Sequence, residues 1–472
     1  MKQNFFNYIS ETFRFSQEEM KDFMRAISQP LKKTIRINTQ KISPQDFKEL
    51  KTYASWTWNS QLSDDESWVF NNTSLWGNML YIDRNNTSIP LWHTLEHISG
   101  YFYVQELAAS SSPYYLSEDK IDTWLYNILD MSASPGGKTT QLAEYYPNSI
   151  IIANEIDKTR LKQLYENTDR LGAKNVFVTN YDGRYFGNYS EIFDKIILDA
   201  PCSWEGVTYK VDTAVKYWNI KNIKRIAKLQ FQLLDAALIA LKSWGEIVYS
   251  TCTLNRLENE EIIEKVIEKY KKYIKISHLS GLGYNKSQYI RSWPHKTWAW
   301  GFFVAKIQKI KSFPKDEFDF RKSKKKLQKH VQGFCKLSST DQKEITKFLQ
   351  ETFMIELPWK FYSYRNEIYY TDKNIDYFWE NFFFYKCGIK IWKFENTCFI
   401  PNYYLGVHFW IFKKNTLDVS EEIIWNLLKW IHQNYNIADG YYQIMHKKIL
   451  AWIVKVKNNS MQTLLETKFM RK

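Results

Sequence analysis

Five short apolar runs, separated by helix-like segments, recur between residues 116 and 310 and constrain the fold of this chain most strongly. The runs are NILDMSA, SIIIANEID, NVFVTNYD, FDKIILDAP and GEIVYSTC. Between them lie amphipathic segments such as KTRLKQLYENTDRLG and IAKLQFQLLDAALIALK. Buried strands that alternate with helices are typical of a βα series, because parallel strands need a crossover connection. We therefore predict an α/β core with a doubly wound parallel sheet.

Cys202 and Cys252 each follow one of these runs. Cys202 lies in ILDAPCSWEG and Cys252 in IVYSTCTLN, so each thiol is expected at the carboxyl end of a buried strand. Ligands of open α/β sheets bind at that edge. A single free cysteine usually packs as a small apolar residue. Two cysteines at equivalent strand ends indicate a reactive site instead.

Acidic residues end the second, third and fourth runs. They are Glu155, Asp182 and Asp199. An acid at such a position can accept hydrogen bonds from ribose hydroxyls, although any one of the three could instead cap a helix.

A glycine turn, MSASPGGKTTQ, follows the first run. It has neither the GxxxxGK[ST] nor the GxGxxG spacing. Its glycines allow close approach of a ligand, and the helix N-terminus after them favours an anionic group. A nucleotide-like ligand is therefore predicted at this edge of the sheet.

The motifs DMSASPGGKTTQ, ANEID, NYDGR, DAPCSWEG and YSTCTLNRLENEE closely resemble those of the NOL1/NOP2/Sun RNA (cytosine-5)-methyltransferases. The segments PLKKTIRINTQKIS, EHISGYFYVQELAAS and GFFVAKI look like the bacterial ribosomal RNA small subunit methyltransferase F subfamily. The resemblance implies a Rossmann-like S-adenosylmethionine-dependent methyltransferase core at residues 116–310. It also implies an N-terminal α+β RNA-binding region at 1–115, and a linker with a PUA-like RNA-binding module at 311–472.

The same resemblance implies a covalent mechanism for forming 5-methylcytosine. Carbon-5 of cytosine is a poor nucleophile, and a thiolate that adds to carbon-6 makes an enamine that can accept a methyl group. Cys252 would be this nucleophile, Cys202 would assist release of the product, and Asp199 would hydrogen-bond the base. Lys210 falls where the family has a basic residue near the active site, but Val211 stands where close relatives have Asp.

Cofactor contacts are also implied by the resemblance. Glu155 would bind the ribose and Asp182 the adenine, with Asp199 at the same edge. The methionine end would lie against Ser132, Ala133, Ser134, Pro135, Gly136, Gly137 and Lys138.

Composition agrees with an RNA partner without requiring one. The formal net charge is +14 and 17% of residues are aromatic, which suits phosphates and unpaired bases, although a Lys-rich surface can merely be solvated. The family points to 16S rRNA in the small ribosomal subunit, with no DNA.

The start lacks the apolar stretch of a signal peptide and no window resembles a membrane span, so a cytoplasmic protein without a membrane partner is expected. Five scattered cysteines predict neither disulfides nor a metal site.

The flanking regions suggest further elements. SQEEMKDFMRAI predicts a helix capped by Ser16, and Ile35 and Ile37 alternate with polar residues as in a half-buried strand. The cations around that strand, Arg36 among them, could face phosphate or solvent. LGVHFWIFKK and KKILAWIVKV are strand-like, SEEIIWNLLKWIHQNY is helical, and the basic run 321–330 is typical of a solvated linker.

Tryptophan stands at several positions where relatives carry glycine. These are Trp92, Trp204 and Trp244, and the chain has 19 Trp but only 16 Gly. One interpretation is a UGA codon that the source organism reads as glycine. The other is genuine drift in an aromatic-rich lineage.

The sequence is also compatible with other functions. Trp204 and Val211 would suit a noncatalytic ribosome-assembly factor with a blocked pocket. The same enzyme class could act on tRNA. A dinucleotide-dependent dehydrogenase is disfavoured by the missing GxGxxG, and a DNA (cytosine-5)-methyltransferase by the TC motif at Cys252.

Overall fold

The computed structural model describes most of the chain. The described residues are 2–29, 33–49, 56–57, 78–84, 90–118, 124–207, 218–281, 284–297, 299–314, 334–357, 360–395, 398–408 and 412–466. Lys210, Val211 and the basic run 321–330 lie outside them, so the expectations for these positions stay predictions.

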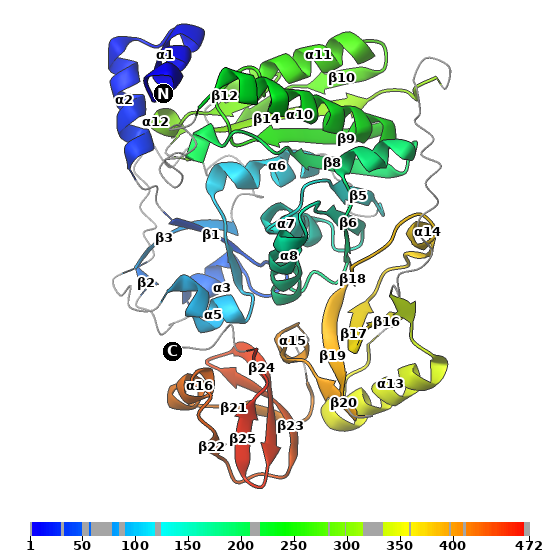
Figure 1. Ribbon diagram of the computed structural model, residues 1–472. Helices are drawn as coiled ribbons and strands as arrows, with labels where there is room; N and C mark the ends of the chain where they lie inside the picture. Colours follow the sequence, from blue (N-terminus) through cyan, green and yellow to red (C-terminus); the bar gives the residue numbers. More distant parts are fainter. Residues whose placement is uncertain are drawn as a thin grey trace.

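The elements follow in chain order and are labelled in Figure 1. The first group is α1 (Lys2–Phe13), α2 (Gln17–Ser28), β1 (Lys33–Ile37), α3 (Pro44–Glu49), β2 (Trp56–Thr57), β3 (Met79–Arg84), η2 (Leu91–His93), α5 (Leu95–Ile98), β4 (Phe102–Val104) and α6 (Leu107–Ser117). The second is β5 (Asn127–Asp130), α7 (Gly137–Tyr145), β6 (Ile150–Asn154), α8 (Lys158–Arg170), β7 (Val176–Thr179), η3 (Gly183–Asn188), β8 (Phe193–Asp199), η4 (Glu205–Val207), α10 (Ile220–Ala240), β9 (Leu241–Thr251), α11 (Glu260–Tyr270), β10 (Ile274–Ser277), β11 (Leu279–Gly281), β12 (Tyr284–Ser287), β13 (Ile290–Ser292), α12 (Pro294–Thr297) and β14 (Phe302–Lys309). The third is β15 (Cys335–Lys336), α13 (Ser339–Phe353), β16 (Lys360–Tyr364), β17 (Glu367–Thr371), α14 (Asp376–Trp379), β18 (Lys386–Cys387), β19 (Ile389–Glu395), β20 (Cys398–Pro401), α15 (Tyr403–His408), β21 (Thr416–Asp418), α16 (Glu421–Leu428), β22 (Gln433–Asn434), β23 (Gly440–His446), β24 (Ile449–Lys457) and β25 (Ser460–Thr463).

A nine-stranded sheet forms the centre of the molecule, in the order β10-β14-β9-β8-β5-β6-β7-β18 with β13 beside β14. The five strands β5 to β9 that the apolar runs predict are all present, and each pairs in parallel with its neighbours in the order β7-β6-β5-β8-β9. Strand β14 then runs antiparallel to β9. The chain order reverses between β5 and β8, and ligands bind beyond the strand ends at such a switch point.

Helices cover both faces of this sheet, as the doubly wound prediction requires (Figure 1). Side chains that alternate along each strand enter two separate cores: Leu129 and Ile152 face one side, whereas Ile128 and Ile151 face the other. Helices α10 and α11 close the first core, and α6, α7 and α8 close the second. The mixed α/β core is therefore confirmed.

The N-terminal segment confirms one expectation and corrects another. Ser16 caps α2 by accepting a hydrogen bond from the backbone N–H of Glu19. Strand β1 is not half-buried, because it lies between β3 and β4 and its Arg36 is only 1% exposed. Arg36 forms an ion pair of 3.2 Å with Glu144 of α7 and donates to Thr140. This cation thus holds the N-terminal sheet to the core and does not face phosphate or solvent.

The C-terminal region contains two five-stranded sheets and also extends the central one. The expected strand over KKILAWIVKV is β24. The first residues of LGVHFWIFKK instead form helix α15, so the strand prediction is wrong there. That helix is packed closely, because Gly406 lies where an added Cβ would come within 2.9 Å of the β24 backbone. The helix over SEEIIWNLLKWIHQNY is shorter than expected and ends at Leu428.

No described helix is both long and apolar enough to cross a lipid bilayer.

Replacing Arg36 tests its structural role. Arg36→Met leaves Glu144 buried without its cation, so we expect the free energy of unfolding to fall by about 3 kcal/mol or more. Chemical denaturation followed by circular dichroism measures the change. Arg25→Met removes the exposed ion pair with Asp22 and is the control expected to have little effect. Equal losses in the two variants would contradict the assigned role of Arg36.

Candidate active site

The two cysteines meet because β8 and β9 end side by side. Their parallel register pairs Asp199 with Ser250, and the backbone N–H of Ala200 donates to the carbonyl of Ser250 at 2.9 Å. The chain then turns at each strand end, and the Sγ atoms of Cys202 and Cys252 lie 3.3 Å apart. Both side chains are partly exposed. The predicted pair of thiols is thus brought together at the carboxyl edge of the sheet.

Asp199 links the cysteine strands to the glycine turn. Its carboxylate accepts from the Lys138 ammonium at 2.7 Å and from the Ser250 hydroxyl at 2.9 Å. Burial opposes the charged form of Lys138, but Asp199, and to a smaller extent Cys252, keeps its pKa above the ordinary value. Lys138 therefore remains a cation, paired with Asp199 at the strand edge.

A buried carboxylate from the Cys202 loop receives hydrogen bonds from the Cys252 loop. Glu205 is fully buried and accepts from the backbone N–H groups of Leu254 and Asn255, at 3.0 and 2.8 Å. The indole of Trp218 donates to the same carboxylate at 2.6 Å. In return, the N–H of Gly206 donates to the carbonyl of Cys252 at 2.9 Å.

Glu258 makes the opposite connection, from the Cys252 side to the Cys202 loop. It is fully buried and accepts from the backbone N–H of Ser203 at 3.1 Å and from Gln230 at 2.8 Å. Gln230 also donates to the carbonyl of Pro201 at 2.9 Å. Burial, with the charge of Glu205, raises the pKa of Glu258 to about 7. Sequence reasoning assigned no role to Glu205, Glu258 or Gln230, although both glutamates lie inside the quoted motifs.

Cys202 is electrostatically unlike a free thiol. Burial raises its pKa well above the ordinary value, and the hydrogen bond and charge of Cys252 and the charge of Glu258 raise it further. Cys202 is therefore protonated at neutral pH.

The predicted glycine turn packs tightly against the N-terminal region. Gly136 adopts φ = 107°, which favours glycine, and precedes α7. A Cβ on Gly137 would come within 2.9 Å of the Tyr103 ring. Helix α7 begins directly after this turn. The first N–H groups of a helix lack partners within the helix, and such groups suit an anionic ligand.

The other predicted acids lie at the expected strand ends. Glu155 is 3% exposed and accepts from the backbone N–H groups of Ser134 and Asp157, at 3.3 and 2.9 Å. Asp182 precedes η3, where hydrogen bonds and an ion pair from Arg184 hold its pKa below the ordinary value. Glu155 thus contacts the glycine turn, whereas Asp182 is held by Arg184.

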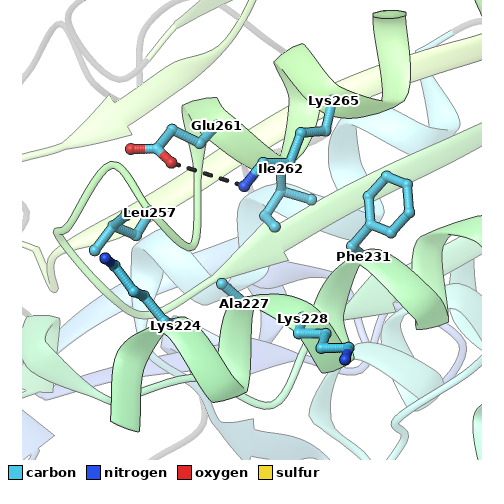
Figure 2. Close-up of a pocket in the computed structure, with 8 residues that line it drawn as sticks. All are labelled: Lys224, Ala227, Lys228, Phe231, Leu257, Glu261, Ile262 and Lys265. Atoms are coloured by element: carbon cyan, nitrogen blue, oxygen red, sulfur yellow. Dashed lines mark ion pairs between the residues drawn. The ribbon is translucent and has the colours of Figure 1, made fainter. Parts of the chain in front are cut away.

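An apolar cavity of about 310 Å³ lies apart from these residues, between α10 and α11 (Figure 2). Phe231, Ile262 and Leu257 line it, and Lys265 at its rim pairs with Glu261 at 3.8 Å. None of the predicted site residues lines this cavity.

Comparison with known proteins decides the family. The family model described as 16S rRNA methyltransferase RsmB/F matches residues 116–308. The ribosomal RNA small subunit methyltransferase F of Shewanella piezotolerans is 36% identical over 389 residues, which cover 80% of this chain and 77% of that relative. The chain belongs to the RsmB/F family of 16S rRNA methyltransferases.

Other relatives agree with this assignment to the RsmB/F family. The methyltransferase F of Vibrio parahaemolyticus is 34% identical, over 72% of this chain and 68% of its own length. The crystal structure of PH0851 superposes with a TM-score of 0.55, 25% identity and 65% coverage of each chain. That of NSun6 from Pyrococcus horikoshii with SFG has a TM-score of 0.50 and 26% identity, and covers 66% of this chain and 98% of its own. As a member of the RsmB/F family, the protein is an S-adenosylmethionine-dependent rRNA methyltransferase with the mixed α/β fold of that class.

Proposed function

We propose that this protein methylates carbon-5 of a cytosine in 16S rRNA of the small ribosomal subunit, through a covalent bond between Cys252 and the base. The observation that carries the proposal is the pair of thiols, 3.3 Å apart, beside the Lys138–Asp199 ion pair. Cytosine-5 chemistry needs one sulfur to add to the ring and a second group to help the product leave. Two juxtaposed thiols supply both functions.

Cys252 is the proposed nucleophile. Its thiolate forms a bond to carbon-6, the ring becomes an enamine, and carbon-5 gains the electron density that methylation requires. The charges around the sulfurs support this choice, because Lys138 interacts favourably with Cys252 whereas the Glu258 carboxylate disfavours a thiolate at Cys202. Asp199, already an acceptor for Lys138 and Ser250, would accept a hydrogen bond from the amino group of the base.

Cys202 is the proposed release group. Product release requires loss of the carbon-5 proton and of the Cys252 sulfur, so that the ring double bond re-forms. While Cys252 is bound to the base as a neutral thioether, it can no longer raise the pKa of Cys202 through its charge. Formation of the adduct therefore makes Cys202 easier to ionise, at the stage when a base is needed.

The strand edge suits S-adenosylmethionine, which supplies an electrophilic methyl group when bound. The backbone N–H groups at the start of α7 fit its carboxylate, and the buried Glu155 carboxylate fits the ribose hydroxyls. Ser132 to Lys138 would hold the methionine end, and Asp182 the adenine. The solved NSun6 relative, described with SFG, supports a cofactor site in this fold.

RNA would be held by the regions on either side of the core. We propose the N-terminal α+β region (1–115) and the PUA-like module within 311–472 for this role, around the core at 116–310. The net charge of +14 supports a polyanionic partner. A base in a duplex cannot present carbon-6 to a thiolate, so the target cytosine must be unpaired or flipped outward. Lys210 would add a further cation near the site.

Trapping the adduct tests this proposal. Cys202→Ala, incubated with S-adenosylmethionine and small ribosomal subunits, should accumulate protein bound to RNA, because addition occurs while release is blocked. A denaturing gel detects the complex. Cys202→Ala combined with Cys252→Ala should give none, and the exposed Cys335→Ala should turn over without trapping.

The RNA that is trapped identifies the substrate, and a failure of trapping tests the reaction itself. An adduct with tRNA but not with small subunits would reassign the substrate within the same enzyme class. No adduct with any RNA, together with no methyl transfer, would contradict the proposal and favour a noncatalytic assembly factor.

A further inference from the structure

Glu258 is placed to act on Cys202 from both sides. It accepts directly from the N–H of Ser203, the residue after Cys202. Through Gln230, which donates to both Glu258 and the carbonyl of Pro201, it also holds the residue before Cys202. Its own position is set from β9, because the hydroxyl of Tyr249 donates to its backbone carbonyl at 2.6 Å. The carboxylate thus holds the residues before and after Cys202, and it does so from the segment that follows Cys252.

We propose that Glu258 is a positioning residue that fixes the Cys202 loop through Ser203 and Gln230 and, by its negative charge beside this loop, makes the surroundings of the two neighbouring sulfurs unequal. The proposal rests on the proposed roles of the two cysteines. It offers a reason why two neighbouring thiols take different parts, because the Lys138 cation is paired with Asp199, whereas the Glu258 carboxylate accepts from the residue after Cys202.

Alkylation of Cys202 with iodoacetamide across pH tests this proposal without RNA or cofactor. Glu258→Gln removes the charge, so the midpoint of the Cys202 profile should move to lower pH. Peptide mass spectrometry follows Cys202, Cys252 and the exposed Cys335 in the same sample.

Two variants separate charge from folding. Glu258→Asp keeps the charge and should keep the high midpoint, and Glu205→Gln neutralises the other buried carboxylate, which does not bracket Cys202. An unchanged midpoint in a folded Glu258→Gln protein, or an equal shift in Glu205→Gln, would overturn the proposal. Because alkylation needs no turnover, this result is independent of whether cytosine is the substrate.

The backbone conformation at several tryptophans supports a second inference. Four of them, Trp218, Trp293, Trp392 and Trp452, are buried at 8%, 5%, 0% and 0% exposure. Three others, Trp204, Trp244 and Trp430, are 49%, 70% and 53% exposed and adopt φ values of 63°, 65° and 60°. A bulky side chain rarely adopts this left-handed conformation, which glycine adopts without penalty.

Trp430 occupies the position where a helix most often requires glycine. Helix α16 ends at Leu428 and Lys429 is its C-cap. The N–H of Trp430 then donates to the carbonyl of Leu427 at 3.1 Å, and that of Ile431 to Asn426 at 2.9 Å. This pair of bonds is the Schellman motif, whose left-handed residue is usually glycine.

Trp244 and Trp204 occupy comparable turns. Trp244 lies in an irregularity of β9, between the pairs Phe193↔Leu241 and Lys195↔Glu246. Its left-handed backbone is one that glycine adopts more readily than any residue with a side chain. Trp204 begins the turn into η4, where the N–H of Val207 donates to its carbonyl at 3.2 Å. Trp92 lies in the short helix η2 instead, so its backbone does not require glycine.

We infer that residues 204, 244 and 430 are glycine in the protein as its source organism makes it, encoded by UGA codons that the organism reads as glycine. The chain's 16 Gly and 19 Trp agree with such a reassignment. Position 204 matters for function, because it lies two residues after Cys202. Glycine there would leave the cysteine loop free of an indole where the base must enter.

Peptide mass spectrometry of the protein from its own cells tests this directly. We expect glycine at 204, 244 and 430, and tryptophan at the buried positions 218, 293, 392 and 452. Tryptophan at 204, 244 and 430 would overturn the inference, whatever the enzyme's substrate.

Recombinant variants give a second measurement. At each of the three positions, Trp→Gly should give a higher melting temperature than Trp→Ala, because alanine is strained at positive φ. Trp124 is 60% exposed but does not adopt a left-handed conformation, and there Trp→Gly should melt below Trp→Ala. If the Trp→Gly and Trp→Ala variants ranked in the same order of melting temperature at position 124 as at 204, 244 and 430, that result would also contradict the inference.

Discussion

The parallel pairing of β8 with β9 is the contact on which the rest of the active site depends. It brings two strand ends into register at Asp199 and Ser250, and both chains turn there towards the same edge. Each strand is buried on both faces, so the apolar packing of α10 and α11 on one side and α6 and α7 on the other holds this register. The two thiols meet because packing fixes the register of the strands that precede them.

Strand pairing alone would not set the loops beyond the strand ends. That task falls to Glu205 and Glu258, which are fully buried and accept hydrogen bonds from the opposite loop. Burying a carboxylate costs free energy unless donors surround it, and here backbone N–H groups and side-chain amides do so. The Glu258 charge also raises the pKa of Cys202, after burial and Cys252. In the proposed mechanism, the polar network that holds the geometry would thus also help to separate the roles of the two cysteines.

Much of this could be predicted from the sequence. Periodicity predicted the five parallel strands, and the position of each cysteine after an apolar run predicted where the thiols would lie. The 3.3 Å contact between them could not be predicted, because it depends on two turns fixed by buried glutamates distant in sequence. Arg36 was misjudged for a related reason: its partner Glu144 is more than a hundred residues away. The start of the predicted strand lies in helix α15, where the residues before His408 are aromatic or apolar on every side, so their pattern does not distinguish the two structures.

The most direct test of the account is to identify the nucleoside that the enzyme makes. Small subunits would be incubated with the protein, or with its Trp204→Gly form, and isotopically labelled S-adenosylmethionine, and the rRNA digested and analysed by mass spectrometry. The account predicts label in 5-methylcytidine, and its loss when Cys252 is replaced by alanine. Label in any other nucleoside, or in 5-methylcytidine without Cys252, would contradict it.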